Sequence, residues 1–333
     1  MHQSTSRQAL LLSTFSAVIG IFPFTFAQAQ SAANPGVVEE NNLTRYSQVC
    51  AISDVHGMYD HLRTLLTAAG IVDGSGNWNA GNILLVVVGD SIDKGPASVK
   101  VIDLWRKLEP QAEQKGGRLI VLLGNHEAEF LADPAAKKSI VFRKELADLH
   151  LDPNLIAKGG DAEGRGKFLL RLPVAAKVGK YLFCHAGWFP PGLKWSDFAA
   201  KAKALLQSAA YGNALITGPH SILEEKNEIG ADGTEVKWYD DPPSVESLEN
   251  RVAHLGLYGT VFGHQPHAFG FKKAIGAVDR LRIIKIDSGM APADSGGDES
   301  TGEILRFTHP GELLLLAAPT AESVNANGEA KRL

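Results

Sequence analysis

The chain contains very little cysteine: among its 333 residues only Cys50 and Cys184 carry a thiol. Two cysteines exclude the dense disulfide framework of a small secreted scaffold. Each lies in an expected strand, shortly before a candidate site residue. Two alternatives stay open: a pair of buried free thiols, which the usual burial of cysteine favours, and a single disulfide bridge.

The chain also lacks an excess of basic residues, because 33 Lys and Arg are set against 37 Asp and Glu, for a formal net charge of −4. Proteins that bind a nucleic-acid polymer usually carry a basic patch or stripe. The composition therefore predicts no nucleic-acid partner. Apolar residues make up 44% of the chain, which is enough for a sizeable globular core.

Long hydrophobic runs are scarce, and the single one occupies residues 9–27. It follows a short segment with one Arg, contains Pro23, and leads to Ala27 and Ala29, which fit a small-x-small cleavage site. These features predict a signal peptide over residues 1–29 and export to the periplasm or out of the cell; an uncleaved membrane anchor is the alternative. No other run approaches roughly 18 residues, so no membrane span is expected after cleavage.

The rest of the chain is interpreted as one domain, because it contains no internal repeat and no long linker. We expect a flexible lead-in at residues 30–44, a single domain at 45–317 and a disordered tail at 318–333, since both ends are rich in small and polar residues. The sequence carries no signal for a particular oligomeric state.

Apolar runs without polar alternation predict buried strands of an α/β protein. They occupy residues 46–53, 83–88, 118–124, 180–184 and 257–263. Helical periodicity predicts helices at residues 58–69, 98–108, 194–210 and 244–255, with 131–149 mostly helical. Late strands are expected in "RLRIIKIDSG", "GEILRFT" and "ELLLLAA", the last two joined by a His-Pro-Gly turn.

Polar residues follow each of the first five strands within a few positions. They are Asp54 and His56, Asp90 and Asp93, Asn125 and His126, His185, and His264 and His267. Because the strand ends of one sheet share an edge, we expect these side chains to converge. Taken singly, each has an ordinary explanation: a turn at Asp54, a helix cap at Asn125, a core histidine at His185 and a surface loop at His267.

Carboxylate, imidazole and amide groups together form a mixed oxygen and nitrogen ligand set. Such a set suits Mn, Fe or Zn better than Ca or Mg. The candidates outnumber the ligands that one ion needs, which indicates two metals sharing a bridging carboxylate. Paired metals of this kind promote in-line displacement, usually at phosphorus.

The stretches "DVHG", "GDSIDKG", "GNHE", "CHAG" and "GHQPH" resemble the five sequence blocks of the calcineurin-like metallophosphoesterases. The resemblance covers roughly residues 46 to 317 and is closest to the phosphoprotein-phosphatase branch and its bacterial relatives. It implies an α/β fold in which a β-sandwich is flanked by helices in αββα layers. The site would lie at the carboxyl ends of the strands, with helical segments in residues 190–256 walling the pocket.

The resemblance also implies a role for each motif residue. Two divalent metals would be held by Asp54 and His56 on one side and by Asn125, His185 and His264 on the other, with Asp90 bridging them. A water or hydroxide between the metals would attack phosphorus. His126 would be the general acid that protonates the leaving oxygen, and Asp93 would hold its tautomer and charge.

The chain departs from the family pattern at three points. Lys94 stands where the family usually has Arg, so it is a candidate phosphate ligand or a solvated surface lysine. Gln265 and Pro266 separate His264 from His267, which leaves open whether His267 reaches the first metal. No second phosphate-binding Arg can be placed near residues 235–243, which offer Asp240 and Asp241 instead.

The expected activity is hydrolysis of phosphomonoesters, with a phosphorylated small molecule or a phosphoprotein as substrate. Two alternatives stay open. One is a phosphodiesterase or dinucleotide-polyphosphate hydrolase, because the same metals would cleave either bond. The other is a non-catalytic binding module of phosphoesterase-like fold, which the intact set of site residues disfavours.

Overall fold

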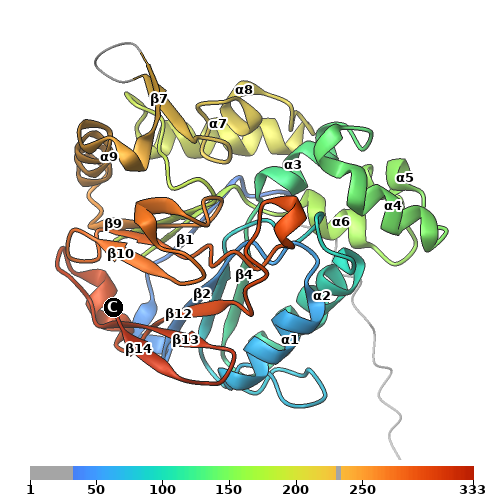
Figure 1. The fold of residues 1–333 in the computed structure, drawn as a ribbon, viewed down its shortest axis with the longest axis horizontal. Coiled ribbons are helices and arrows are strands. Elements are labelled where there is room, and N and C mark those ends of the chain that lie inside the picture. Colours follow the sequence, from blue (N-terminus) through green and yellow to red (C-terminus); the bar gives the residue numbers. More distant parts are fainter. Residues whose placement is uncertain (1–32, 230–233) are drawn as a thin grey trace, which may run out of the picture. The chain divides into compact units, whose positions relative to one another are not determined.

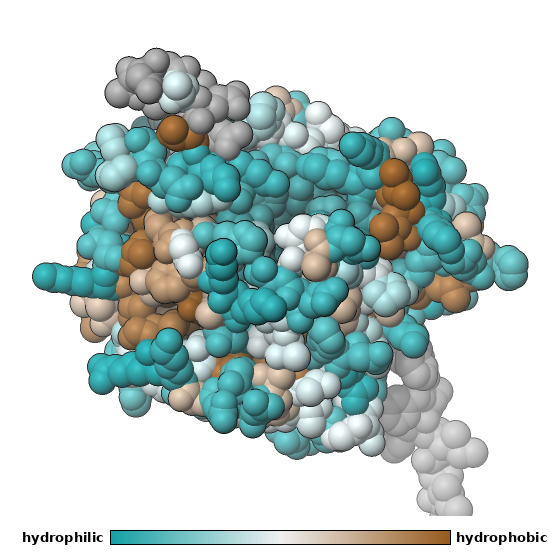
Figure 2. Space-filling view, viewed as in Figure 1, coloured by the Kyte–Doolittle hydropathy of each residue, from teal (hydrophilic) through white to brown (hydrophobic). Residues whose placement is uncertain are grey.

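The computed structural model describes residues 33–229 and 234–333, so the predicted signal peptide lies outside the described residues. In this part of the chain, no helix combines the length and the hydropathy needed to cross a bilayer. The face in Figure 2 is mainly hydrophilic, with apolar patches at its left and over the region of α4.

Two six-stranded sheets form the centre of the domain (Figure 1). The first has the order β14-β13-β12-β2-β3-β4, with β2 Val49–Ile52, β3 Leu84–Val87, β4 Arg118–Val121, β12 Glu303–Phe307, β13 Ala321–Asn325 and β14 Ala330–Arg332. The second has the order β1-β5-β6-β9-β11-β10, with β1 Val37–Glu40, β5 Ala175–Val178, β6 Tyr181–Cys184, β9 Gly259–Phe262, β10 Gly276–Val278 and β11 Ile283–Lys285. A separate hairpin pairs β7 Asn227–Ile229 with β8 Glu235–Lys237.

Helices cover the outer faces of the sheets. They are α1 Tyr59–Ala68, α2 Ser98–Gln114, α3 Asn125–Ala132, α4 Ile140–Asp148, α5 Pro153–Ala157, α6 Arg165–Leu170, α7 Trp195–Gln207, α8 Ala214–Thr217 and α9 Pro242–His254. The predicted helix at 98–108 continues through Pro110 to Gln114. The predicted segment at 131–149 is broken, because α3 ends at Ala132 and α4 begins at Ile140.

Alternate residues of each central strand enter different cores, which explains the unbroken apolar runs. Leu84 and Val86 of β3 pack with Phe183 of β6 and Val261 of β9, between the sheets. Leu85 of β3 belongs to the second core, which includes residues of α1 and α2. Because both faces of the strand are buried, neither can carry polar residues. The αββα arrangement expected from the resemblance is confirmed.

Both chain ends of the expected domain differ from the prediction. The lead-in is not without structure, because β1 pairs in parallel with β5. The tail is not disordered either, because β13 pairs with β12 and β14 pairs with β13. Ala321 and Val324 are buried in the tail. These few apolar residues are stabilised because β13 pairs with β12, which itself pairs with β2 in the sheet; composition alone does not reveal this pairing.

The prediction of a strand in "ELLLLAA" is also wrong. Residues Pro310–Leu314 form a 3-10 helix, in which Leu313 is buried. Leu315 and Leu316 are 56% and 63% exposed. The partner of β12 is therefore not this run but β13, further along the chain.

Candidate active site

The polar residues after the five predicted strands meet at one rim of the sandwich. The sequence suggested that their strands belong to one sheet, and this is wrong. β2, β3 and β4 lie in the first sheet, and β6 and β9 lie in the second. The convergence therefore depends on how the two sheets pack. Asp54, Asp90 and Asn125 come from one sheet, and His185 and His264 come from the other.

The backbone turns sharply where the chain leaves these strands. Positive φ angles occur at Asp54 (52°), His56 (47°), Asp90 (53°), Asp93 (66°) and His264 (66°). The left-handed region is unfavourable for residues with a Cβ, and such residues cluster where function requires an unusual side-chain direction. Here the turns aim carboxylates and imidazoles at a common point.

Two glycines allow the loops to approach each other closely. A Cβ at Gly124 would lie 2.0 Å from Asp90 Oδ1, and a Cβ at Gly263 would lie 2.1 Å from Asp54 Oδ2. Both distances are far below contact, so neither position tolerates a side chain without movement of a carboxylate. The glycines in "GNHE" and "GHQPH" are thus required by the site itself.

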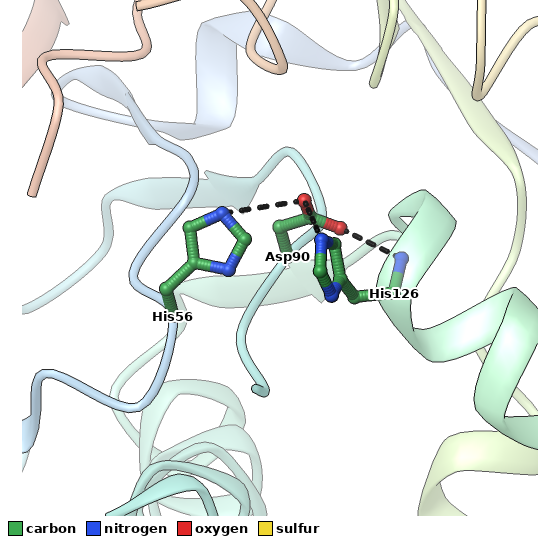
Figure 3. A group of neighbouring side chains, drawn as sticks. All are labelled: His56, Asp90 and His126. Carbon is green, nitrogen blue, oxygen red and sulfur yellow. Dashed lines mark hydrogen bonds and ion pairs between the residues drawn. The ribbon is translucent and has the colours of Figure 1, made fainter. Parts of the chain in front are cut away.

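Asp90 lies at the centre of the cluster (Figure 3). Its Oδ2 is 3.4 Å from His56 Nε2, 3.2 Å from His185 Nε2 and 4.0 Å from His126 Nε2. The described residues form two groups of metal-capable side chains, one with His56 and His126 and one with His185 and His264, and Asp90 belongs to both. This placement is the one that a bridging carboxylate requires.

The imidazoles are oriented as metal ligands. His56 Nδ1 lies 3.2 Å from the carbonyl oxygen of Ile92, and His185 Nδ1 lies 2.9 Å from that of Val88. If each Nδ1 donates its proton to the carbonyl, the lone pair is left on Nε2, as for histidines that bind metals. Among the described residues, His264 Nε2 is buried and has no hydrogen-bond partner. A divalent cation fits this donor set.

The charges of the site call for a cation. Burial and the charge of Asp90 raise the pKa of Asp54. Burial opposes ionisation of Asp90, but His185 and His126 hold its pKa well below the usual range. Burial likewise disfavours the charged form of His185, yet Asp90 and Asp54 raise its pKa to about 10. The carboxylates thus attract positive charge strongly, which a bound metal would also supply.

His126 is held by Asp93 on one side of the cluster. His126 Nδ1 lies 3.0 Å from Asp93 Oδ2, and the His126 backbone N–H donates to Asp90 Oδ1 at 3.1 Å. The other Asp93 oxygen accepts from the backbone N–H of Phe142 at 2.8 Å. A proton on Nδ1 is therefore fixed toward Asp93, and His126 Nε2 points toward Asp90.

The two remaining candidates behave differently. Lys94 is half-buried, and its Nζ lies 2.9 Å from His56 Nε2. Its side chain therefore contacts the candidate site. His267 is in neither metal-capable group of the described residues. Its Nε2 instead lies 3.0 Å from Asp298 Oδ2, and its side chain is 47% exposed. The structure therefore does not bring His267 to the other ligands.

Sequence reasoning missed Glu127, which organises the loop after β3. Its Oε2 accepts from the backbone N–H groups of Asp90 and Gly124 at 3.0 and 2.8 Å, and its Oε1 accepts from those of Ser91 and Ile92 at 2.7 and 3.1 Å. A glutamate three residues after Gly124 at a helix start is a capping signature that was visible in "GNHE".

Two lysines near the site were also missed. Desolvation and the charges of Lys138 and Lys94 lower the pKa of Lys226, whereas Glu224 opposes them. Lys138 Nζ donates to Glu224 Oε1 at 2.8 Å. Burial, His185 and Lys226 together keep the pKa of His264 well below its usual value. Neither lysine lies in a recognisable motif: Lys138 belongs to the 3-10 helix Lys137–Ser139 between α3 and α4, and Lys226 lies in the loop between α8 and β7.

Mixed carboxylate and imidazole side chains at the rim of a rigid scaffold are typical of metal-dependent hydrolases, in which the metal activates water and polarises the substrate. The sequence model of the calcineurin-like phosphoesterases matches residues 47–268. The chain therefore belongs to that family.

Individual relatives match only part of their length. The Shewanella-like protein phosphatase 1 of Plasmodium berghei is 30% identical over 153 residues, which cover 44% of this chain and 41% of that protein. A symmetrical bis(5'-nucleosyl)-tetraphosphatase of Baumannia cicadellinicola is 29% identical over 184 residues, covering 52% and 53%. The chain spans about half the length of these two relatives.

Among solved structures, the cold-active protein-tyrosine phosphatase of a psychrophilic Shewanella has a TM-score of 0.66 and 21% identity, with coverage of 91% of this chain and 83% of that one. At this identity the likeness shows the fold.

Proposed function

We propose that the protein is a phosphomonoesterase that uses two divalent metal ions, of Mn, Fe or Zn. The observation that carries the proposal is the pair of His126 and Asp93, 3.0 Å apart, beside a carboxylate that two metal-capable groups share. A histidine held this way can donate a proton to a leaving oxygen.

The donor set divides into two halves around Asp90. Asp54 and His56 would hold one ion, and Asn125, His185 and His264 the other. Asn125 Oδ1 lies 3.1 Å from His185 Nε2, which places both donors together. When bound, the ions would supply Lewis acidity toward the phosphoryl group and an attacking water of lowered pKa.

The chain's own residues would handle the leaving group and the phosphate. His126 would carry a proton on Nε2 for the leaving oxygen, and Asp93 would stabilise the imidazolium through Nδ1. Lys94 would attract a phosphate oxygen as a point charge, without the two-pronged contact of an arginine. Lys226 would add positive charge on the side of His264, where its charge already acts on that histidine.

A dinucleotide-polyphosphate hydrolase is the second candidate, favoured by the match to the bis(5'-nucleosyl)-tetraphosphatase. The test is a comparison of p-nitrophenyl phosphate, bis-p-nitrophenyl phosphate and a dinucleoside tetraphosphate, with protein stripped by chelator and reloaded with Mn²⁺. Preference for the monoester supports the proposal. Preference for the tetraphosphate supports the second candidate, and activity that survives metal removal contradicts both.

We also propose that the protein is exported after cleavage behind Ala29. The support is the apolar run at residues 9–27 and the small residues that follow it. N-terminal sequencing of the mature protein should begin near Gln30. A mature chain that retains residues from the first 29 would contradict the proposal.

A further inference from the structure

A concave feature lies next to the loop that carries Asp93 and Lys94, because Pro96 and Ala97 line it. It is a cavity of about 720 Å³ between the start of α2 and the helices α4 to α6. Pro96, Ala97 and Val99 line it from one side, and Val141, Leu149 and Leu151 line it from the other. Its volume falls in the range of ligand-binding pockets.

The apolar side chains of the cavity are partly open to solvent. Val141 is 37% exposed and Leu149 is 51% exposed. The apolar patch in Figure 2 lies over this region of α4. The lining contains aliphatic side chains but no aromatic ring. A nucleobase is usually held by stacking on an aromatic face, so the walls suit aliphatic groups better than bases.

The charges at the cavity balance each other. Three basic and three acidic residues line it: Lys100, Lys144, Arg165, Glu145, Asp148 and Glu163. Lys144 pairs with Asp148, and Arg165 pairs with Glu163. A polyanion such as a dinucleoside polyphosphate would meet carboxylates here and would gain no net positive field. A peptide segment of low net charge needs no aromatic face for stacking, and the carboxylates would not repel it.

The cavity continues from the catalytic loop. Pro96, which lines the cavity, is three residues after Asp93 and two after Lys94. The Asp93 backbone N–H donates to Ser98 Oγ at 3.0 Å, and Glu145 accepts from the N–H groups of Ser98 and Val99 at 2.8 and 3.0 Å. The loop, the start of α2 and α4 thus form one hydrogen-bonded unit. Three extended residues span roughly 11 Å at most, so Pro96 at the cavity lies no further than this from Asp93.

We propose that this cavity binds an aliphatic side chain of a phosphoprotein substrate, about three residues away from the phosphorylated residue. The inference rests on the proposed phosphomonoesterase function and assigns its substrate class. The phosphate would lie at the metal cluster and Lys94, while the chain continues past Pro96 into the cavity.

The test compares two phosphopeptides with p-nitrophenyl phosphate, using the full chain loaded with Mn²⁺. One peptide carries leucine at three residues on either side of the phosphoserine, and the other carries serine there. We expect kcat/KM to be about 10-fold higher for the leucine peptide, mainly through KM, as for an apolar group that fills a pocket.

The variant Leu149→Glu should abolish this preference and leave p-nitrophenyl phosphate hydrolysis unchanged. Leu315→Glu is the matched control, because Leu315 is an exposed leucine outside this cavity, and it should keep the preference.

Three outcomes would overturn the inference. The first is equal rates for both peptides in the wild type, and the second is an unchanged preference for the leucine peptide in Leu149→Glu. The third is a loss of activity in Leu149→Glu that is equal for both peptides and for p-nitrophenyl phosphate. In each of these cases the hydrolysis of p-nitrophenyl phosphate by the wild type would leave the proposed function standing. A wild type that hydrolyses none of the three substrates with Mn²⁺ would contradict the proposed function itself.

Discussion

Asp93 joins His126 to α4: one of its carboxylate oxygens lies 3.0 Å from His126 Nδ1, and the other accepts the backbone N–H of Phe142 at 2.8 Å. The carboxylate is thereby fixed from two sides, and the imidazole is fixed by the carboxylate. Such an arrangement is suited to a proton donor, whose tautomer and direction must be set before the substrate arrives.

His126→Asn should lower turnover of a phosphoserine peptide by ~10²–10⁴-fold, the range for lost general acid catalysis. The loss should be much smaller for p-nitrophenyl phosphate, because p-nitrophenolate departs without a proton. Both rates are measured at saturating substrate, and Asp93→Asn should show a milder form of the same pattern. An equal loss for the two substrates would show that His126 is not the acid.

The metal content of His126→Asn separates the acid from a ligand. His126 Nε2 lies 4.0 Å from Asp90 Oδ2, close enough to belong to a metal-capable group. We expect the variant to retain two metals by elemental analysis. Loss of one metal would instead assign His126 as a ligand.

Asp90→Asn should weaken binding of both metals at once, because Asp90 is shared by the two groups. The measurement is the number of metal ions per chain after dialysis, together with activity. Asp60→Asn, at an exposed position of α1, is the control and should bind like the wild type. Retention of two tightly bound metals in Asp90→Asn would contradict the bridging role.

Glu127→Gln should destabilise the folded protein by about 2–5 kcal/mol. The NH2 group of the glutamine cannot accept a hydrogen bond, so two buried backbone N–H groups would lose the carboxylate oxygen that accepts from them in the wild type. The free energy of unfolding is measured in urea. Glu113→Gln, an exposed change in α2, should alter it by less than about 0.5 kcal/mol. Equal stability of the two variants would show that Glu127 is not the organiser of the loop.

Deletion of residues 321–333 should lower stability by roughly 3 kcal/mol or more, since it removes the buried Val324 and exposes the edge of β12. Deletion of residues 330–333 alone should have a small effect, because the residues of β14 are exposed. Urea unfolding of both deletions is the measurement. A wild-type midpoint for the longer deletion would support the disordered tail that composition predicted.

Cys50 and Cys184 should be unreactive in the native protein. Both are free and buried, and burial raises the pKa of Cys50 to about 11 and that of Cys184 to about 12. Because both pKa values lie far above 8, the thiols stay protonated at pH 8, where only a thiolate would react. A thiol reagent should count almost none in buffer and two in denaturant; none in denaturant would indicate a disulfide.

Much of the candidate site could be predicted because several of its residues follow an apolar strand within a few positions. Asp54, Asp90 and Asn125 were located by the end of a buried run, a feature that depends on a few neighbouring residues. The helices at 58–69 and 98–108 were visible in the same way, from their own periodicity. Short local sequence patterns are therefore enough to predict the strands and helices that position the loops of the candidate site.

The partners of those elements were decided only by the tertiary structure. The sequence could not show that β6 and β9 belong to a different sheet from β2 and β3, because sheet order follows from contacts between segments up to hundreds of residues apart. Local patterns likewise did not show that β12 pairs with β13 rather than with the nearer leucine run, or that His267 contacts Asp298 rather than the candidate metal ligands. Local patterns set which residues can form a strand or a turn, whereas burial against distant segments selects among the arrangements that remain.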